Sequence, residues 1–273
     1  NTSMDVSWQV SVPSYPGVKL QGTLRVNDPL RSIPLRRTGV EIPAWNAGLV
    51  IADLDGDHRM EMLIANRFGL SIHGWNGTTY AQQWCYPFWI NGTTGATAVA
   101  ARDLDGDSRM EIVFAEGNVL VRLDGATRKE TARHLGSSGQ RILDVKIADL
   151  DRDGAQEIIC LEGAQYGTTS HLLVLDGNTL ALKWKSAELG LGSALAIGNV
   201  DADAALEIVT AGGYVFDGAT KENEWAYSPG FGRTVATGDL DGDGIQEIVG
   251  MQDWTVFKGF SAVLKSPVWE KTG

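Results

Sequence analysis

The chain has 273 residues, of which 43% are hydrophobic, and it carries a formal net charge of −11. This composition supplies a sizeable core, and repeat architectures often reach this length as a single domain. No stretch approaches the roughly 18–20 consecutive apolar residues of a membrane-spanning helix, and no stripe of basic residues indicates a nucleic-acid surface. We therefore expect neither membrane insertion nor nucleic-acid binding.

Residues 1–46 contain two strand-like runs, SWQVSV and VKLQGTLRV. They contain no acidic loop of the kind that recurs later in the chain. We predict that this segment forms a degenerate unit of the repeat described next, or supplies strands that close a ring. The sequence leaves open whether the chain is part of a larger chain or assembly.

From residue 47 onward, a nine-residue acidic loop recurs between two apolar runs, with starting points 50, 46, 50 and 40 residues apart. The copies, numbered loops 1 to 5, are DLDGDHRME at 53–61, DLDGDSRME at 103–111, DLDRDGAQE at 149–157, NVDADAALE at 199–207 and DLDGDGIQE at 239–247. Oxygen-bearing side chains occupy positions 1, 3, 5 and 9 of every copy. This spacing indicates loops that curl around a hard cation.

Each loop belongs to a longer unit of four predicted strands. Apolar runs precede and follow the loop, a third run ends in an Asn-Gly or Asp-Gly turn in four copies, and a fourth often carries tryptophan, as at Trp84, Trp184 and Trp225. Such turns favour tight antiparallel hairpins. Short strands every 40–50 residues without helical periodicity predict the blades of a β-propeller, with the tryptophans packed between neighbouring blades.

We therefore predict an all-β fold in which residues 1–273 form a single β-propeller domain of four-stranded antiparallel blades. Residues 47–272 supply five blades with acidic loops, and residues 1–46 supply a sixth, metal-free blade or ring-closing strands. A fragment of a seven-bladed propeller is the alternative. Each blade needs a neighbour because it cannot bury both of its faces alone.

The predicted ion is Ca²⁺, with up to five bound. The loops hold 19 of the 34 acidic residues, so five divalent cations would leave a net charge of about −1. All-oxygen ligands with several carboxylates favour Ca²⁺ over the rigidly octahedral Mg²⁺. An EF-hand is a poor fit, because its loop needs an acid at position 12, where loop 1 has Ile64.

Loop 4 is predicted to be the weakest calcium site. It has Asn199 at position 1, which removes one charge. It also has Ala202 and Ala204 where loop 5 has glycines that ease the turn.

These loops resemble the calcium-binding repeats of FG-GAP and VCBS-type β-propellers, a group that includes the integrin α-subunit head. The resemblance implies that side chains at positions 1, 3, 5 and 9 and the carbonyl at position 7 bind Ca²⁺. Carried over, the ligands are Asp53, Asp55, Asp57, Arg59 and Glu61; Asp103, Asp105, Asp107, Arg109 and Glu111; Asp149, Asp151, Asp153, Ala155 and Glu157; Asn199, Asp201, Asp203, Ala205 and Glu207; and Asp239, Asp241, Asp243, Ile245 and Glu247.

The predicted function is a non-catalytic recognition or adhesion module that is extracellular, on the cell surface or periplasmic, where calcium is abundant. A protein or glycan is expected to bind the face opposite the acidic loops, where aromatic residues lie among Gly, Asn and Thr. The candidate contacts are Tyr86, Phe88, Trp89, Tyr166, Phe231 and Trp254. Two alternatives remain: several of these rings cap the core, or the chain is the propeller of a polysaccharide-acting enzyme such as a lyase. No catalytic constellation is visible in the sequence.

Overall fold

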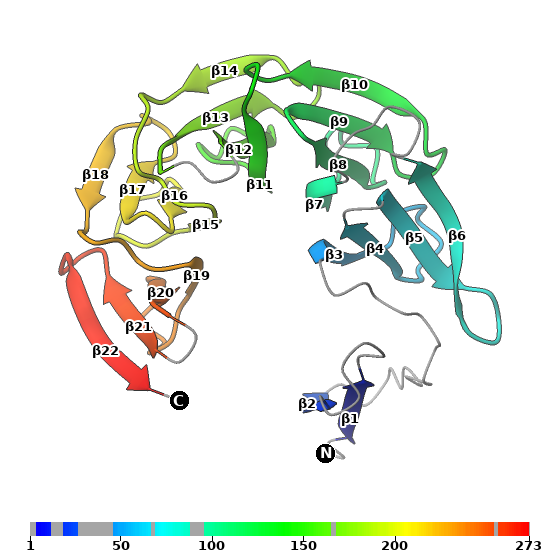
Figure 1. Ribbon diagram of the computed structural model, residues 1–273, viewed down its shortest axis with the longest axis horizontal. Helices are drawn as coiled ribbons and strands as arrows, with labels where there is room; N and C mark the ends of the chain where they lie inside the picture. Colours follow the sequence, from blue (N-terminus) through cyan, green and yellow to red (C-terminus); the bar gives the residue numbers. More distant parts are fainter. Residues whose placement is uncertain are drawn as a thin grey trace.

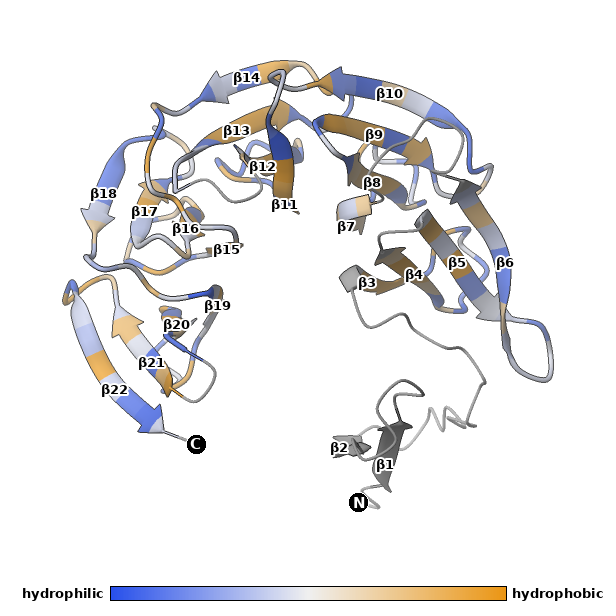
Figure 2. Cartoon of the chain, in the orientation of Figure 1, coloured by the Kyte–Doolittle hydropathy of each residue, from blue (hydrophilic) through white to orange (hydrophobic). Residues whose placement is uncertain are grey.

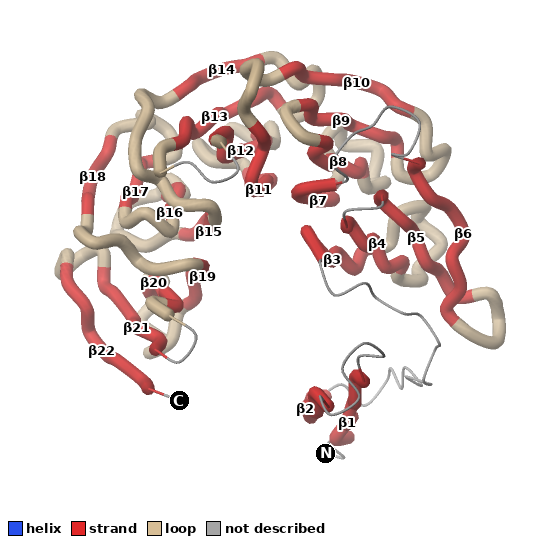
Figure 3. Tube along the Cα trace, viewed as in Figure 1, coloured by secondary structure: helices blue, strands red, loops and turns tan. Residues whose placement is uncertain are grey.

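The computed structural model describes residues 4–11, 19–26, 46–66, 69–87, 96–164, 168–253 and 256–272, and every helix or strand within these ranges is a β-strand (Figure 3). Within the same ranges, no helix is long and apolar enough to span a bilayer. The all-β prediction is confirmed.

Twenty strands form five four-stranded antiparallel sheets, and in each sheet the strands lie side by side in chain order. Sheet 1 contains β3 (Asn46–Ala52), β4 (Glu61–Asn66), β5 (Gly69–Trp75) and β6 (Tyr80–Pro87). Sheet 2 contains β7 (Ala96–Arg102), β8 (Glu111–Glu116), β9 (Val119–Asp124) and β10 (Glu130–Leu135). Sheet 3 contains β11 (Arg141–Ala148), β12 (Glu157–Gly163), β13 (Ser170–Asp176) and β14 (Leu182–Lys185).

Sheet 4 contains β15 (Leu195–Gly198), β16 (Glu207–Thr210), β17 (Tyr214–Asp217) and β18 (Asn223–Ala226). Sheet 5 contains β19 (Thr234–Gly238), β20 (Glu247–Met251), β21 (Val256–Ser261) and β22 (Ser266–Thr272). The four-strand unit predicted for each repeat is therefore present five times.

The five sheets stand side by side in an open arc, with the first strand of each sheet innermost and the fourth outermost (Figure 1). β1 (Met4–Ser11) and β2 (Lys19–Val26) form a separate two-stranded antiparallel sheet near the opening of the arc. In the described part of residues 1–46, these two strands pair only with each other. The sixth blade predicted there remains a prediction.

The core is divided among the four seams between adjacent sheets. β12 illustrates how one strand serves two seams, because successive side chains of a strand point to opposite faces. Ile158 and Cys160 pack with residues of sheet 2, whereas Ile159 and Leu161 pack with residues of sheet 4. All seven residues of β12 are buried. Figure 2 shows the resulting pattern: apolar strands such as β9 and β13 lie inside the mostly polar outer strands β10, β14 and β18.

The fourth-strand tryptophans lie in the seams, as predicted. Trp84 packs against the cluster shared by sheets 1 and 2, and Trp184 lies 6.1 Å from Phe216 of sheet 4, measured between ring centroids. Trp225 is 8% exposed and lies 5.1 Å from Phe231. Trp269 on β22 is 38% exposed, and no further sheet follows it in the described residues.

Candidate metal centre

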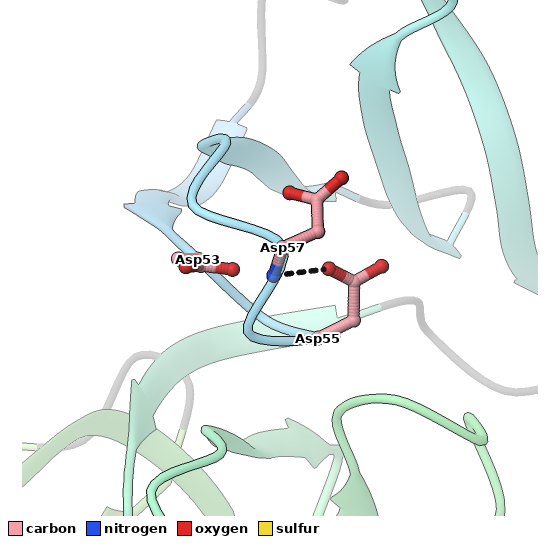
Figure 4. A group of neighbouring side chains, drawn as sticks. All are labelled: Asp53, Asp55 and Asp57. Carbon is pink, nitrogen blue, oxygen red and sulfur yellow. Dashed lines mark hydrogen bonds between the residues drawn. The ribbon is translucent and has the colours of Figure 1, made fainter.

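Each acidic loop joins the first strand of its sheet to the second, and its carboxylates accept hydrogen bonds from its own backbone. In loop 1, Asp53 accepts the N–H groups of Gly56 and His58, each at 2.9 Å. Asp55 Oδ1 accepts the N–H of Asp57 at 3.2 Å (Figure 4). These local bonds curl the chain so that the three carboxylates lie around one point.

The other loops share this local geometry. The carboxylate at position 3 accepts the N–H of position 5, and the carboxylate at position 5 accepts the N–H of position 7, in all five loops. Loop 4 differs at position 1, where the Asn199 amide donates to the Asp203 carbonyl at 2.9 Å. The repeated sequence therefore encodes a repeated loop conformation.

Position 9 of every loop is a glutamate that begins the second strand of its sheet. Its Oε2 accepts the N–H of position 2 at 2.6–3.0 Å. In loops 1 to 4 this glutamate is at most 3% exposed. Burial raises the pKa of Glu61 and Glu111, and burial together with Asp201, Asp203 and Glu224 raises the pKa of Glu207 to about 7. A buried carboxylate in this setting stays ionised only where positive charge lies beside it, and otherwise takes up a proton.

The carboxylates of several loops come close enough to share one ion. Oxygen atoms lie within 4.8 Å of one another in the groups Asp53–Asp55–Asp57, Asp103–Asp105–Glu111 and Asp149–Asp151–Glu157. In loop 4 the corresponding groups are Asp201–Glu207–Glu224 and Asp203–Glu207–Asp217. Positions 1, 3 and 9 thus converge in loops 2 and 3, whereas positions 1, 3 and 5 converge in loop 1. The carbonyls at position 7 remain predicted ligands.

Some of these oxygens are buried without a hydrogen-bond partner in the part of the chain that the structure describes. They are Asp149 Oδ1, Asn199 Oδ1 and Glu207 Oε1. Buried polar atoms are almost always paired, so these oxygens are open to a hydrogen-bond donor, a water molecule or a cation. The donor set consists of oxygen atoms, which fits a hard divalent cation such as Ca²⁺.

Two basic side chains contact the loops and were missed from the sequence. Arg122 on β9 places Nη2 3.0 Å from Asp105 Oδ2, while its Nη1 donates to Asn178 Oδ1 at 2.8 Å in the turn of sheet 3. Lys183 on β14 places Nζ 2.6 Å from Glu157 Oε1. Successive side chains of a strand alternate between the two faces of its sheet, so the sequence could have indicated the face on which each basic side chain lies. Only the packed sheets reveal the carboxylates that they contact.

The acidic loops and the Asp-Gly turns lie on one side of the arc and are connected by backbone hydrogen bonds. In sheet 3, the N–H of Gly177 donates to the carbonyl of Gln156 at 2.9 Å. Between sheets, Leu206 of loop 4 donates to Leu150 of loop 3 at 3.1 Å, and Gln246 of loop 5 donates to Asn199 at 2.8 Å. These bonds place the turn of sheet 3 beside loop 3, and they join loops 3, 4 and 5 on one side of the arc.

The predicted aromatic contact surface requires a correction. Phe231 is fully buried in the seam between sheets 4 and 5, where its ring stacks on Tyr227 at 5.9 Å. It is therefore a core residue and not a surface contact. Tyr86 is half-buried, and its ring centroid lies 5.0 Å from that of Phe114 across the seam between sheets 1 and 2. Four predicted contacts lie outside the described residues: Phe88, Trp89, Tyr166 and Trp254.

Comparison with solved structures finds the same fold in proteins of low sequence identity. The crystal structure of the V. cholerae biofilm matrix protein Bap1 aligns with a TM-score of 0.56 and 18% identity, covering 82% of this chain and 38% of the Bap1 chain. The chain thus spans less than two-fifths of the length of Bap1. The crystal structure of BBS1N in complex with ARL6DN aligns with a TM-score of 0.60 and 13% identity, covering 85% of this chain and 70% of that chain.

Comparison at the sequence level identifies the repeat. No curated protein sequence matches the chain. Residues 53–114, which include loops 1 and 2, match the family model described as an FG-GAP-like repeat. The resemblance that the acidic loops indicated is therefore confirmed: residues 53–114 are an FG-GAP-like repeat.

Proposed function

We propose that this chain is a calcium-stabilised β-propeller module that recognises a protein or glycan outside the cytoplasm. The observation that carries the proposal is the convergence of carboxylates in the repeated loops, with buried oxygens that lack partners among the described residues. Ca²⁺ accepts six to eight oxygen ligands in flexible geometry, and this donor set suits it. The five sheets arranged in an arc support the propeller architecture.

The role proposed for calcium is structural. An ion that binds the folded loops and not the unfolded chain stabilises the fold by mass action. Because hydrogen bonds join loops 3, 4 and 5, order in one loop supports the next. Chemical unfolding of the chain in excess calcium and in excess chelator tests this role. A midpoint that does not change between the two conditions would refute it.

Recognition outside the cell is proposed from two likenesses. Residues 53–114 match an FG-GAP-like repeat, and the similar Bap1 structure is that of a biofilm matrix protein. Calcium supply also favours this location, since loops of modest affinity fill readily at extracellular calcium levels. We further propose that the module is not an enzyme. In this proposal the clustered carboxylates of loops 1 to 4, which accept hydrogen bonds from backbone N–H groups, serve as calcium ligands and not as catalytic groups.

The proposed binding face is the one opposite the acidic loops, where second-to-third and fourth-to-first strand connections meet. Trp89 and Tyr166 are the two residues to replace first, because aromatic rings among small polar residues suit sugar stacking or protein contact. The test is a screen of glycans and candidate protein partners with the purified chain, in calcium and in chelator.

A matched control is available on the acidic side of the arc. His58 has a side chain that is 93% exposed, and the equivalent residue of loop 2 is Ser108. We expect W89A and Y166A to weaken binding and H58S to leave it unchanged. Binding that survives both aromatic substitutions would exclude this face. Turnover of acidic polysaccharides would exclude the non-catalytic assignment.

A further inference from the structure

Loop 4 lacks one of the charges of the other loops, but the fold brings another carboxylate to it. Glu224 lies on β18, the outermost strand of sheet 4, 17 residues after the end of the loop. Oxygen atoms of Asp201, Glu207 and Glu224 lie within 4.8 Å of one another. The charge lost at Asn199 is thus restored from a different strand.

The buried residue Glu207 points independently to a ligand at this place. Its side chain is fully buried, and its Oε2 accepts the N–H of Val200 at 2.6 Å. Its Oε1 has no hydrogen-bond partner among the described residues, and neither has Oδ1 of Asn199. An ionised buried carboxylate surrounded by further acids is strongly unfavourable unless a cation or a proton neutralises it, and a bound cation would also give Oε1 a partner.

Sheet 3 contains the counterpart of this arrangement. Lys183 immediately precedes Trp184, as Glu224 immediately precedes Trp225, and the two tryptophans pair with the equivalent residues Val174 and Val215. Lys183 and Glu224 therefore occupy the same position in adjacent sheets. At loop 3 this position places an ammonium 2.6 Å from Glu157 Oε1, whereas at loop 4 it places a carboxylate beside Glu207.

The site at loop 4 is also accessible. An open pocket of about 480 Å³ lies over it, and its lining includes Asp201, Asp203 and Glu224. Lys265, from the turn between β21 and β22, also lines the pocket, but its ammonium donates to the backbone carbonyl of Glu224 at 2.8 Å. The pocket gives an ion and its water ligands a path to the carboxylates.

We propose that Glu224 is a ligand of a divalent cation at loop 4, supplied by β18 from outside the repeated loop. This inference rests on the calcium binding proposed above. With Glu224 included, loop 4 offers four carboxylates, as the other loops do. The ion at loop 4 therefore binds as tightly as the ions at the other loops, whereas the loop sequence alone predicts a weak site. In sheets 3 and 4, the identity of this one position sets whether the loop receives an ammonium group or an additional carboxylate.

The test counts bound Ca²⁺ by native mass spectrometry of the full chain during a calcium titration. We expect E224Q to lower the affinity for one Ca²⁺ roughly tenfold, because one ligand charge is lost. E222Q is the matched control: Glu222 is exposed, lies two residues away, and its replacement changes the net charge equally. Asp201→Asn is expected to lower the affinity for the same Ca²⁺. Adding E224Q to Asp201→Asn should lower that affinity little further.

A second variant separates ligation from a purely structural role. E224K reproduces the residue found at Lys183, so its ammonium should pair with Glu207. We expect E224K to lose one calcium ion while the chelator-treated protein becomes at least as resistant to urea as the parent.

The outcomes separate this inference from the proposed function. Calcium binding that is equal in the parent, E224Q and E222Q would overturn the role of Glu224 and leave the calcium loops intact. A parent chain that binds no calcium would overturn both.

Discussion

Lys183 and Glu157 form an ion pair within sheet 3, with Nζ 2.6 Å from Oε1. Glu157 is buried, whereas the lysine side chain is 41% exposed. The ammonium thus supplies part of the positive charge that a cation would bring to loop 3. The lysine and an ion bound at loop 3 would therefore compensate the charge of the same carboxylate.

The substitution K183M should destabilise the chelator-treated protein, because a buried carboxylate loses its charged donor. Solvent screens part of the ion pair, so the expected loss is about 1–2 kcal/mol. In excess calcium the loss should be smaller. Urea unfolding in both conditions measures the difference. The exposed residue Lys129 provides the control, because K129M should not change the unfolding free energy in chelator or in calcium. An equal loss with and without calcium would contradict the prediction.

Replacing one loop carboxylate with its amide should remove one calcium ion without unfolding the loop. Asp241 Oδ1 accepts the N–H of Asp243 at 3.2 Å, and asparagine retains that acceptor. For a site saturated at 100 times its dissociation constant, the ion contributes about 2.7 kcal/mol. D241N should therefore lower stability by up to that amount in calcium and leave it nearly unchanged in chelator. Isothermal titration calorimetry and urea unfolding test the two parts separately.

The close approach of the turn to loop 3 should make Gly177 intolerant of a side chain. A Cβ at this position would lie 2.3 Å from the Gln156 carbonyl oxygen. We expect G177A to cost about 1–3 kcal/mol of unfolding free energy. Gly238, at the end of β19, has no atom within 4 Å of the equivalent Cβ, so G238A should stay within about 0.5 kcal/mol of the parent. Similar values for both would disprove the role of this contact.

Glu162 should give the protein an acid-dependent stability that is separate from the calcium loops. This glutamate is 1% exposed and accepts hydrogen bonds from Lys185 Nζ and Ser137 Oγ, both at 2.8 Å. Burial opposes its ionised form, but the Lys185 and Ser137 donors outweigh it and lower its pKa below 4.5. Its stabilising effect is therefore complete above the unfolded value and is lost as the pH falls through the folded pKa.

The substitution E162Q tests this dependence. In chelator at pH 7, we expect it to cost about 2 kcal/mol, because the buried donors lose their charged acceptor. The difference from the parent should shrink as the pH falls below about 4.5. Urea unfolding between pH 3 and pH 7 measures it, and a difference that does not vary with pH would refute the assignment.

The two tryptophans Trp225 and Trp269 should differ sharply in their contribution to stability. Trp225 is 8% exposed in the seam between sheets 4 and 5, whereas Trp269 is 38% exposed on β22. We expect W225A to cost about 3–5 kcal/mol and W269A about 1 kcal/mol. Thermal or urea unfolding in saturating calcium compares them directly. A larger effect at Trp269 would mean that another chain or segment covers β22 in solution.

Local rules made much of this fold predictable. Apolar runs separated by acidic loops and by Asn-Gly or Asp-Gly turns indicated four strands per repeat, and five such sheets are present. The acidic spacing indicated convergent carboxylates, which loops 2 and 3 contain at positions 1, 3 and 9. Phe231 was misassigned because a glycine-rich segment resembles a surface loop, yet its ring fills a seam. Nothing local distinguishes an aromatic residue that faces a neighbouring sheet from one that faces solvent.

The sequence by itself determined the local conformation of each repeat, because hydrogen bonds between near neighbours set the loops and a period of two sets the strand faces. Only the tertiary structure decided the surroundings of each equivalent position. Leu54 and Leu150 at position 2 of their loops are fully buried, whereas Leu240 at the same position is 56% exposed. Likewise, Lys183 and Glu224 share one position but meet loops of different charge. The burial and the electrostatic environment of a residue depend on the adjacent sheet and strand, so the sequence of a single repeat does not determine them.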